Sequence, residues 1–366
     1  MWAPRGTGSS PSRVWPCLRR NELKIGEVYF ICERDRLDGT SSSNVKIGIV
    51  EDVKRDSHKR LKAHQTGNPR DLELHHVTQT PGPHRVETFL HQQFGPNRVR
   101  SEWFRLSDEE LDLAVQTAER MAQEAFLHVP VMKAAEELKD VVSSADKIAP
   151  TDESTQWFKA WNEANAALKR CEELSNLYRE LASDLNADER TQVEEEELIV
   201  TEYVTNATFD HQGFAEKYPG LLEEYKNVET TINGSCRKTE YDVDLAEIDR
   251  ELASFCQTFE DLCEQCKRGE MAFGDLFEPH QILERFTGSY SWDKDVADAH
   301  LRVICGSSAG IDGQVTWNRS ARDKPILDKE RLESEHGEKY REFVEVKTGS
   351  RLKTKRRARR AAPPAS

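Results

Sequence analysis

The sequence of 366 residues contains no apolar run long enough to cross a bilayer, and residues 1–20 lack the apolar stretch of a signal peptide. Both absences predict a cytoplasmic protein with no membrane partner. Its eight cysteines lie mostly singly along the chain, which does not fit the disulfide framework of a small secreted domain, so we expect reduced thiols. The run Gly306–Gly310 lacks the Lys-Ser/Thr pair of a phosphate-binding loop and predicts a turn.

Positive charge is not in excess either. The net charge of −14 argues against a protein that coats nucleic acid over its whole surface, because phosphates are attracted to positive charge. Any such contact is expected to be local. Basic side chains gather in three segments: Lys54, Arg55, Lys59, Arg60 and Lys62; Arg98, Arg100 and Arg105; and Arg351, Lys353, Lys355, Arg356, Arg357, Arg359 and Arg360. From the first two segments we take as candidate substrate-binding residues Arg55, Lys59, Lys62, Arg98 and Arg100.

The N-terminal third has the pattern of a small α+β unit. Two β-prone segments, 27–32 and 45–50, flank the turn-rich stretch 38–44, which predicts a hairpin. Periodicity and Pro69 predict further elements after the hairpin. They are a helix at 53–64, a strand at 72–78, a helix at 86–94 and an amphipathic helix at 108–124. The fold class is therefore α+β, a small mixed sheet flanked by helices and followed by a mainly helical half.

Two long apolar stripes mark that helical half. Positions from Trp157 to Leu185 step by threes and fours, as do positions from Leu245 to Cys266. Each stripe has to be buried, either against the other as a helical hairpin or in the seam of a homodimer. Cys263 and Cys266 form a single Cys-x-x-Cys pair, which we interpret as core packing rather than half of a zinc site because no second pair stands at finger spacing.

An internal repeat runs through the same half. The segment that begins at Phe209-Asp210 and ends at Tyr225 matches the segment from Leu327-Asp328 to Phe343 at a constant offset of 118. We therefore predict two copies of one unit. The expected domains are a disordered leader at 1–22, an α/β domain at 23–125, a linker at 126–155, repeat copies at 156–242 and 243–350, and a basic disordered tail at 351–366.

An ordered set of short motifs lies within the N-terminal unit. They are Val28-Tyr29-Phe30, Lys46-Ile47-Gly48, Arg60-Leu61, Gln65 to Pro69, Glu87-x-x-x-His91-x-x-Phe94 and Glu102-Trp103-Phe104. This order resembles the phage-type branch of the GIY-YIG nuclease superfamily. The tail from Gly313 to Arg351 also resembles that of phage-type YqaJ exonucleases, which implies a nucleic-acid-processing setting and no chemistry of its own.

The resemblance implies a role for each motif residue. Glu87 would bind Mg²⁺ or Mn²⁺, Arg60 would hold a phosphate oxygen, and Tyr29 would act as a base. The pKa of a tyrosine is about 10, so we expect nearby positive charge to lower it. Lys46 stands where most relatives have a second tyrosine, and we expect it to lower the pKa of Tyr29 or to contact phosphate. His64 shares a helix face with Arg60.

Some positions leave alternatives open. His91 shares a helix face with Glu87, and both His64 and His91 are candidates for proton transfer. Arg55 competes with Arg60 for the catalytic place because the segment before Arg60 is longer than in the family, and the role of Glu102 is open. The sequence predicts a metal-dependent DNA endonuclease of phage defence or a mobile element. Its rivals are an inactive nucleic-acid-binding module and a dimeric helical scaffold.

Overall fold

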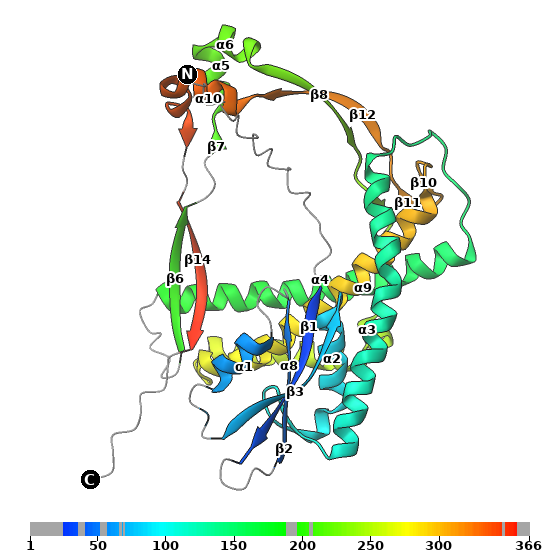
Figure 1. Ribbon diagram of the computed structural model, residues 1–366, viewed down its shortest axis with the longest axis vertical. Helices are drawn as coiled ribbons and strands as arrows, with labels where there is room; N and C mark the ends of the chain where they lie inside the picture. Colours follow the sequence, from blue (N-terminus) through cyan, green and yellow to red (C-terminus); the bar gives the residue numbers. More distant parts are fainter. Residues whose placement is uncertain are drawn as a thin grey trace, which may run out of the picture.

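The computed structural model describes residues 25–35, 41–51, 57–65, 68, 70–187, 196–204, 208–345 and 348–356 (Figure 1). The fold is α+β, as the sequence predicts, with a sheet near the N-terminus and a mainly helical region after it. The sheet is antiparallel throughout, whereas the sequence analysis expects a mixed sheet. No helix in this described part of the chain combines the length and the apolar content needed to cross a membrane.

The N-terminal sheet has five strands in the order β3-β1-β2-β5-β4. They are β1 (Gly26–Arg34), β2 (Ser41–Val50), β3 (Asp71–Thr80), β4 (Arg98–Arg100) and β5 (Trp103–Arg105). The predicted hairpin forms, since β1 and β2 pair antiparallel with Tyr29 opposite Gly48. The turn predicted at 38–44 extends too far toward the C-terminus, because Asn44 lies in β2 and pairs with Arg105 of β5.

Alternation along the strands gives this sheet two covered faces. Val28 and Phe30 pack with α2 (Pro83–Gln93) and α3 (Asp108–Glu137), whereas Tyr29 and Ile31 point to the other face, where α1 (Ser57–Gln65) contributes Leu61. Helix α3 begins with a capping box. It extends to Glu137, so the first part of the predicted linker is helical. The chain then passes through η3 (Leu138–Asp140).

The two predicted stripes are buried within the chain. Helices α4 (Asp152–Ala187), α7 (Leu245–Ile248) and α8 (Arg250–Lys267) carry them, and Leu174 of α4 shares a core with Phe259 of α8. The cysteines of the Cys-x-x-Cys pair are buried in that core as free thiols. Because both stripes are covered in this way, a homodimer through them is not supported.

A third long helix was missed by the sequence analysis. Helix α9 (Phe277–Cys305) follows the short η4 (Phe273–Leu276) and lies against α2, α3 and α4. Its sequence contains Pro279 in the first turn and Gly288 near the middle, together with several serines and aromatic residues, all of which have low helix propensity. Its stability therefore depends on packing, with Leu283 and Phe286 buried in the core of α4 and α8.

The segments of the predicted repeat pair with each other. Copy one contains β6 (Glu196–Val204), β7 (Thr208–Phe209), α5 (His211–Lys217), α6 (Pro219–Glu224), β8 (Lys226–Asn233) and β9 (Arg237–Lys238). Copy two contains β10 (Gly310–Ile311), β11 (Val315–Thr316), β12 (Ser320–Leu327), α10 (Lys329–Arg341), β13 (Val344–Glu345) and the start of β14 (Thr348–Arg356). Because β14 continues to Arg356, the prediction of a disordered tail is wrong for residues 351–356, and residues 357–366 lie outside the described part of the chain. Strand β6 pairs with β14, β7 with β13, β8 with β12 and β9 with β11, all antiparallel.

Two hydrogen bonds show the symmetry of this pairing. The amide of Asp210 donates to the carbonyl of Phe343 at 2.8 Å, and the equivalent amide of Asp328 donates to the carbonyl of Tyr225 at 2.9 Å. Both aspartates also cap the helix that follows them. The two segments therefore lie about an approximate two-fold axis.

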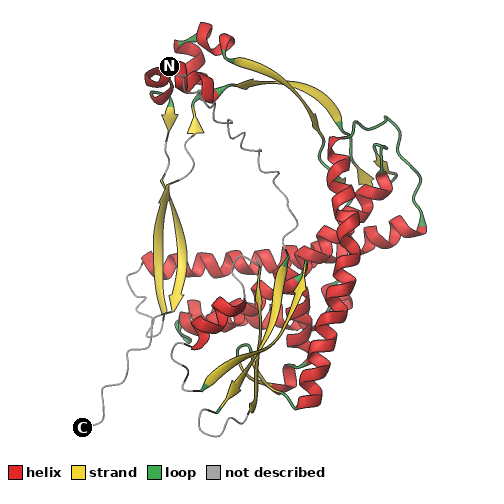
Figure 2. Cartoon of the chain, in the orientation of Figure 1, coloured by secondary structure: helices red, strands yellow, loops and turns green. Residues whose placement is uncertain are grey.

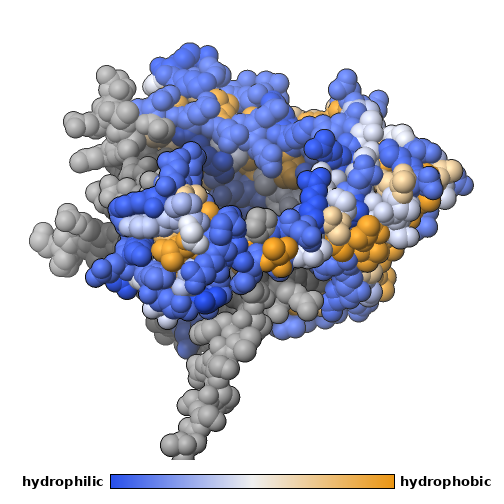
Figure 3. Space-filling view, turned by 90° about the horizontal axis from the view of Figure 1, so that it is seen from above, coloured by the Kyte–Doolittle hydropathy of each residue, from blue (hydrophilic) through white to orange (hydrophobic). Residues whose placement is uncertain are grey.

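The paired ribbons form an arm outside the helical region (Figure 2). Ribbons β6/β14 and β8/β12 connect the body to a small apolar cluster that includes Phe209, Phe214 and Leu332. The face of the molecule shown in Figure 3 is mostly hydrophilic, and its hydrophobic residues lie in small separate groups. This distribution agrees with the high charged content of the chain.

Candidate functional site

A cavity of about 870 Å³ lies between the N-terminal sheet and the helical region. Its lining comes from β1, β2, α1, α2, the turn between β4 and β5, η4 and α9. Six of the residues selected from the sequence line it: Tyr29, Lys46, Arg60, His64, Glu87 and Arg100. The structure thus brings together residues that are up to 71 positions apart in the chain.

Gly48 allows the Tyr29 ring to lie flat across the sheet. The two residues are directly opposite in the β1–β2 register, and a Cβ atom at Gly48 would lie 2.6 Å from the Tyr29 hydroxyl oxygen. Any side chain there would displace the phenol. The glycine of the Lys-Ile-Gly motif therefore fixes where the hydroxyl meets the cavity.

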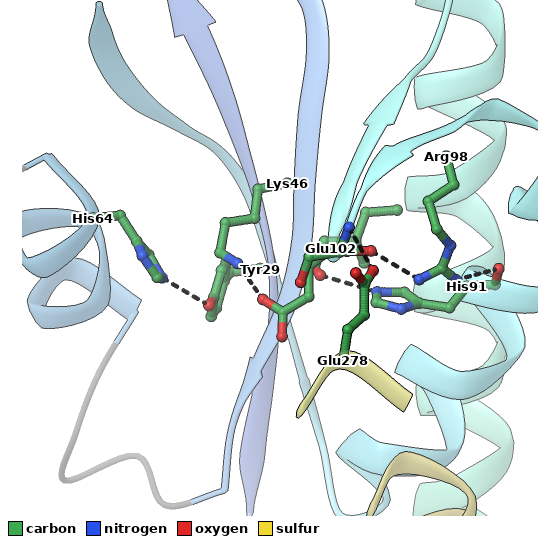
Figure 4. Close-up of polar contacts among 9 residues, drawn as sticks. Tyr29, Lys46, His64, His91, Arg98, Glu102 and Glu278 are labelled. Carbon is green, nitrogen blue, oxygen red and sulfur yellow. Dashed lines mark hydrogen bonds and ion pairs between the residues drawn. The ribbon is translucent and has the colours of Figure 1, made fainter. Parts of the chain in front are cut away.

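The Tyr29 hydroxyl lies 3.4 Å from Nε2 of His64 (Figure 4). Burial raises the pKa of Tyr29 strongly, the negative charge of Glu102 raises it further, and Arg60 opposes them only in part. The expectation that nearby positive charge lowers this pKa is therefore wrong. Burial, followed by the charge of Lys46, lowers the pKa of His64 to about 4. A neutral His64 at pH 7 is able to accept a hydrogen bond from the phenol.

Lys46 makes an ion pair with Glu102 across the neighbouring strands (Figure 4). Burial opposes ionisation of Glu102, but the charge and hydrogen bond of Lys46 outweigh it and the pKa of Glu102 is lowered. Glu102, whose role the sequence leaves open, is therefore the counter-ion of Lys46. After burial, the charge of Glu102 is the largest cause that raises the pKa values of Tyr29 and Glu87.

Glu87 is the most deeply buried carboxylate of the cavity, with 2% of its surface exposed. Burial, and then the charge of Glu102, raise its pKa to about 8, although Arg285 and Lys46 act in the opposite direction. A cation bound at this carboxylate would favour its ionised form. No group of three or more ligating side chains exists among the described residues.

Comparison with protein families finds one match in this part of the chain. Residues 26–121 match the T5orf172 domain. This domain is associated with nuclease-like proteins. Comparisons with curated proteins and with solved structures find no match.

Several residues selected from the sequence lie in the T5orf172 domain but do not line this cavity. His91 is buried, and its Nε2–H group donates to the carbonyl of Ile47 at 3.0 Å. Arg98 donates to the carbonyls of Ser101 and His91 and lies 5.0 Å from the centre of the Phe104 ring. Both have structural contacts that explain their positions. Lys59 and Lys62 are exposed on α1, outside the cavity lining, and Arg55 lies outside the described residues.

The sequence analysis missed the wall of the cavity that lies outside the T5orf172 domain. Helix α9 and the adjoining η4 supply it, and its charged residues are Asp275, Glu278, Glu284 and Arg285. Glu278 accepts a hydrogen bond from the amide of Ser101 at 2.9 Å (Figure 4). No local motif marks these residues. Helix α9 begins about 150 residues after the matched segment ends, and nothing in its sequence indicates that it packs against that segment.

Proposed function

We propose that the protein is a metal-dependent endonuclease that hydrolyses phosphodiester bonds in DNA. The observation that supports this most is that Tyr29, Lys46, Arg60, His64 and Glu87, from four different elements, line one cavity. The match to a nuclease-associated domain over the same residues supports the same chemistry. DNA rather than RNA follows from the family resemblance.

Each residue has a part in this proposal. Glu87 would hold Mg²⁺ or Mn²⁺, which would neutralise negative charge on the scissile phosphate. Arg60, which is exposed at the cavity, would hold a non-bridging oxygen of that phosphate. Tyr29 would take a proton from the attacking water while passing its own proton to His64. This relay removes the need for an ionised tyrosine in the free protein.

Cleavage of a supercoiled plasmid tests the proposal. We expect Mg²⁺-dependent nicking or linearisation by the wild type and a loss of about 100-fold or more in Glu87→Ala, because removing a charge-stabilising group commonly costs that much. Glu87→Gln keeps the shape of the side chain and should be equally impaired. Absence of cleavage by the wild type with both Mg²⁺ and Mn²⁺ would refute the enzyme assignment.

One observation favours a second candidate, a nucleic-acid-binding module without catalysis. The pKa of Glu87 is about 8, so this carboxyl is mostly protonated at pH 7 unless a cation binds. In that case the cavity would bind nucleic acid without hydrolysing it. The same plasmid assay, together with a gel-shift measurement, separates the two functions, since binding without cleavage is the result for the second.

A further inference from the structure

Helix α9 is fixed against α2 directly beside Glu87. The hydroxyl of Thr88 donates to the carbonyl of Arg285 at 3.1 Å, and the guanidinium of Arg85 donates to Asp293 at 2.7 Å. Gly288 permits this approach, because a Cβ atom there would lie 2.4 Å from the ring of His84. The position of Arg285 at the cavity is therefore a consequence of close packing between two helices.

Arg285 is a buried cation that makes no direct ion pair in the described part of the chain, although its charge acts on the carboxyl groups of Glu87 and Glu102. Only 8% of its surface is exposed, and among the described residues its guanidinium has no ion pair or hydrogen bond. A buried charge is costly unless it is paired. Lys46, the other buried cation of the cavity, has such a partner in Glu102. Among the described residues the guanidinium of Arg285 therefore has no direct ion pair, and it is able to pair with an anionic ligand that enters the cavity.

Glu87 does not pair with this guanidinium directly. It lines the same cavity and the two charges influence each other, but no ion pair within 4.0 Å joins them in the structure. A buried cation and a buried carboxyl group thus line one cavity without a direct ion pair between them. This arrangement suits a ligand that carries negative charge for the guanidinium and leaves the carboxylate to hold a metal cation.

We propose that Arg285 binds a phosphodiester group of the nucleic acid, so that the site is shared between the T5orf172 domain and helix α9. This inference rests on the proposed function and identifies a substrate-binding residue outside the matched domain. A guanidinium binds two phosphate oxygens at once through its planar set of N–H donors. Arg60 and Arg100 are exposed at the same cavity and would hold the flanking backbone.

The rim of the α9 wall limits what can reach Arg285. Asp275, Glu278 and Glu284 are exposed at the cavity, and their charges repel a polyanion. A nucleic-acid strand that passes these carboxylates contacts one buried cation, Arg285, rather than a continuous basic surface. The contact therefore adds a single phosphate interaction. A salt titration detects it as a change in the slope of log K against log salt.

Binding of a short fluorescent DNA duplex, measured by anisotropy in EDTA at several salt concentrations, tests the inference. We expect Arg285→Ala to weaken binding roughly tenfold, and the slope of log K against log salt to fall by about 0.9, the value for one lost phosphate contact. Arg285→Lys should recover most of the slope but not all of the affinity. Arg250→Ala on α8 is the matched control, because it removes one exposed cation outside the cavity lining, so its slope should be that of the wild type.

The outcomes separate this inference from the proposed function. A folded Arg285→Ala protein with the wild-type salt slope overturns the role of Arg285 even if the wild type cleaves DNA with Mg²⁺. A reduced slope without cleavage by the wild type keeps the role of Arg285 and removes the nuclease. If Arg285→Ala does not fold, Arg285→Gln, which keeps most of the side-chain length without the charge, is judged by the same slope. A wild type that does not bind the duplex at low salt overturns the inference.

Discussion

At the scale of single residues, burial is the main cause of the shifted pKa values of the titratable groups in the cavity. Glu87 and Tyr29 both have raised pKa values because their charged forms are taken out of water, and His64 has a lowered pKa for the same reason. Three groups that the resemblance assigns to catalysis are thus mainly neutral at pH 7 in the free protein. The proton relay and the metal proposed above start from these neutral forms.

The pH dependence of stability tests the state of Glu87. Its pKa is about 8 in the folded chain against 4.5 when it is unperturbed, so the folded chain binds this proton more tightly. Its contribution to stability is therefore full below pH 4.5 and is lost as the pH rises through 8, by up to about 1.4 kcal/mol per pH unit.

Urea unfolding of the wild type and Glu87→Gln at pH 5 and pH 7.5, in EDTA, measures this. Glutamine cannot ionise, so we expect the free energy of unfolding of Glu87→Gln, relative to the wild type, to increase at the higher pH. An equal difference at the two pH values would show that Glu87 has an ordinary pKa.

At the scale of elements, the contact between α2 and α9 decides whether the cavity is complete. Helix α2 carries Glu87 and belongs to the T5orf172 domain, whereas α9 carries Arg285 and lies outside it. The two helices approach closely at Gly288 and His84, and also at Gly82 and Trp292, where a Cβ atom on the glycine would lie 3.0 Å from the indole. A side chain at Gly288 would therefore force a shift of His84, whereas one at Gly82 would make a tight contact with Trp292.

A substitution at Gly288 tests the importance of this contact. Gly288→Val would place branched carbons within the His84 ring, so we expect a loss of about 1–3 kcal/mol of stability and reduced DNA cleavage as α9 moves away. Thermal unfolding and the plasmid assay measure the two effects. Gly220→Ala in α6 is the matched control, because a Cβ atom there meets nothing within 4 Å. Equal stability of the two variants would argue against close packing.

At the scale of the whole molecule, the net charge of −14 opposes the binding of a polyanion such as nucleic acid. The cavity attracts nucleic acid only through individual cations, because its lining holds four lysine and arginine side chains and six carboxyl groups. The exposed carboxylates of η4 and α9 stand at the edge of that site. A protein of this kind should bind nucleic acid weakly in general and better where the backbone reaches the cavity.

Removing charge from the rim should therefore strengthen binding. We expect the double variant Glu278→Gln with Glu284→Gln to bind a DNA duplex about threefold to tenfold more tightly at low ionic strength, with the difference shrinking as salt screens exposed charges. Anisotropy titrations at two salt concentrations measure it. Glu229→Gln on β8, exposed and outside the cavity lining, is the control and should change little. Unchanged affinity of the double variant would place the nucleic acid elsewhere.

The sequence by itself determined the local elements and the set of candidate residues. β-prone residues between turn signals predicted β1, β2 and β3, and the order of the motifs selected Tyr29, Arg60 and Glu87, because these signals lie in residues close together in the chain. The two apolar stripes predicted α4 and α8 in the same way. The 118-residue repeat identified the segments that pair in the arm.

Only the tertiary structure decided which of those residues meet and in what protonation state. The pKa of Tyr29 has the opposite direction from the one expected, because a pKa depends on burial and on Glu102, which lies 73 residues away in the chain. The α9 wall with Arg285 has no local signal, because that helix is stabilised by packing rather than by propensity. Long-range burial is a property of the folded chain, and it sets both the charge of the cavity and its boundary.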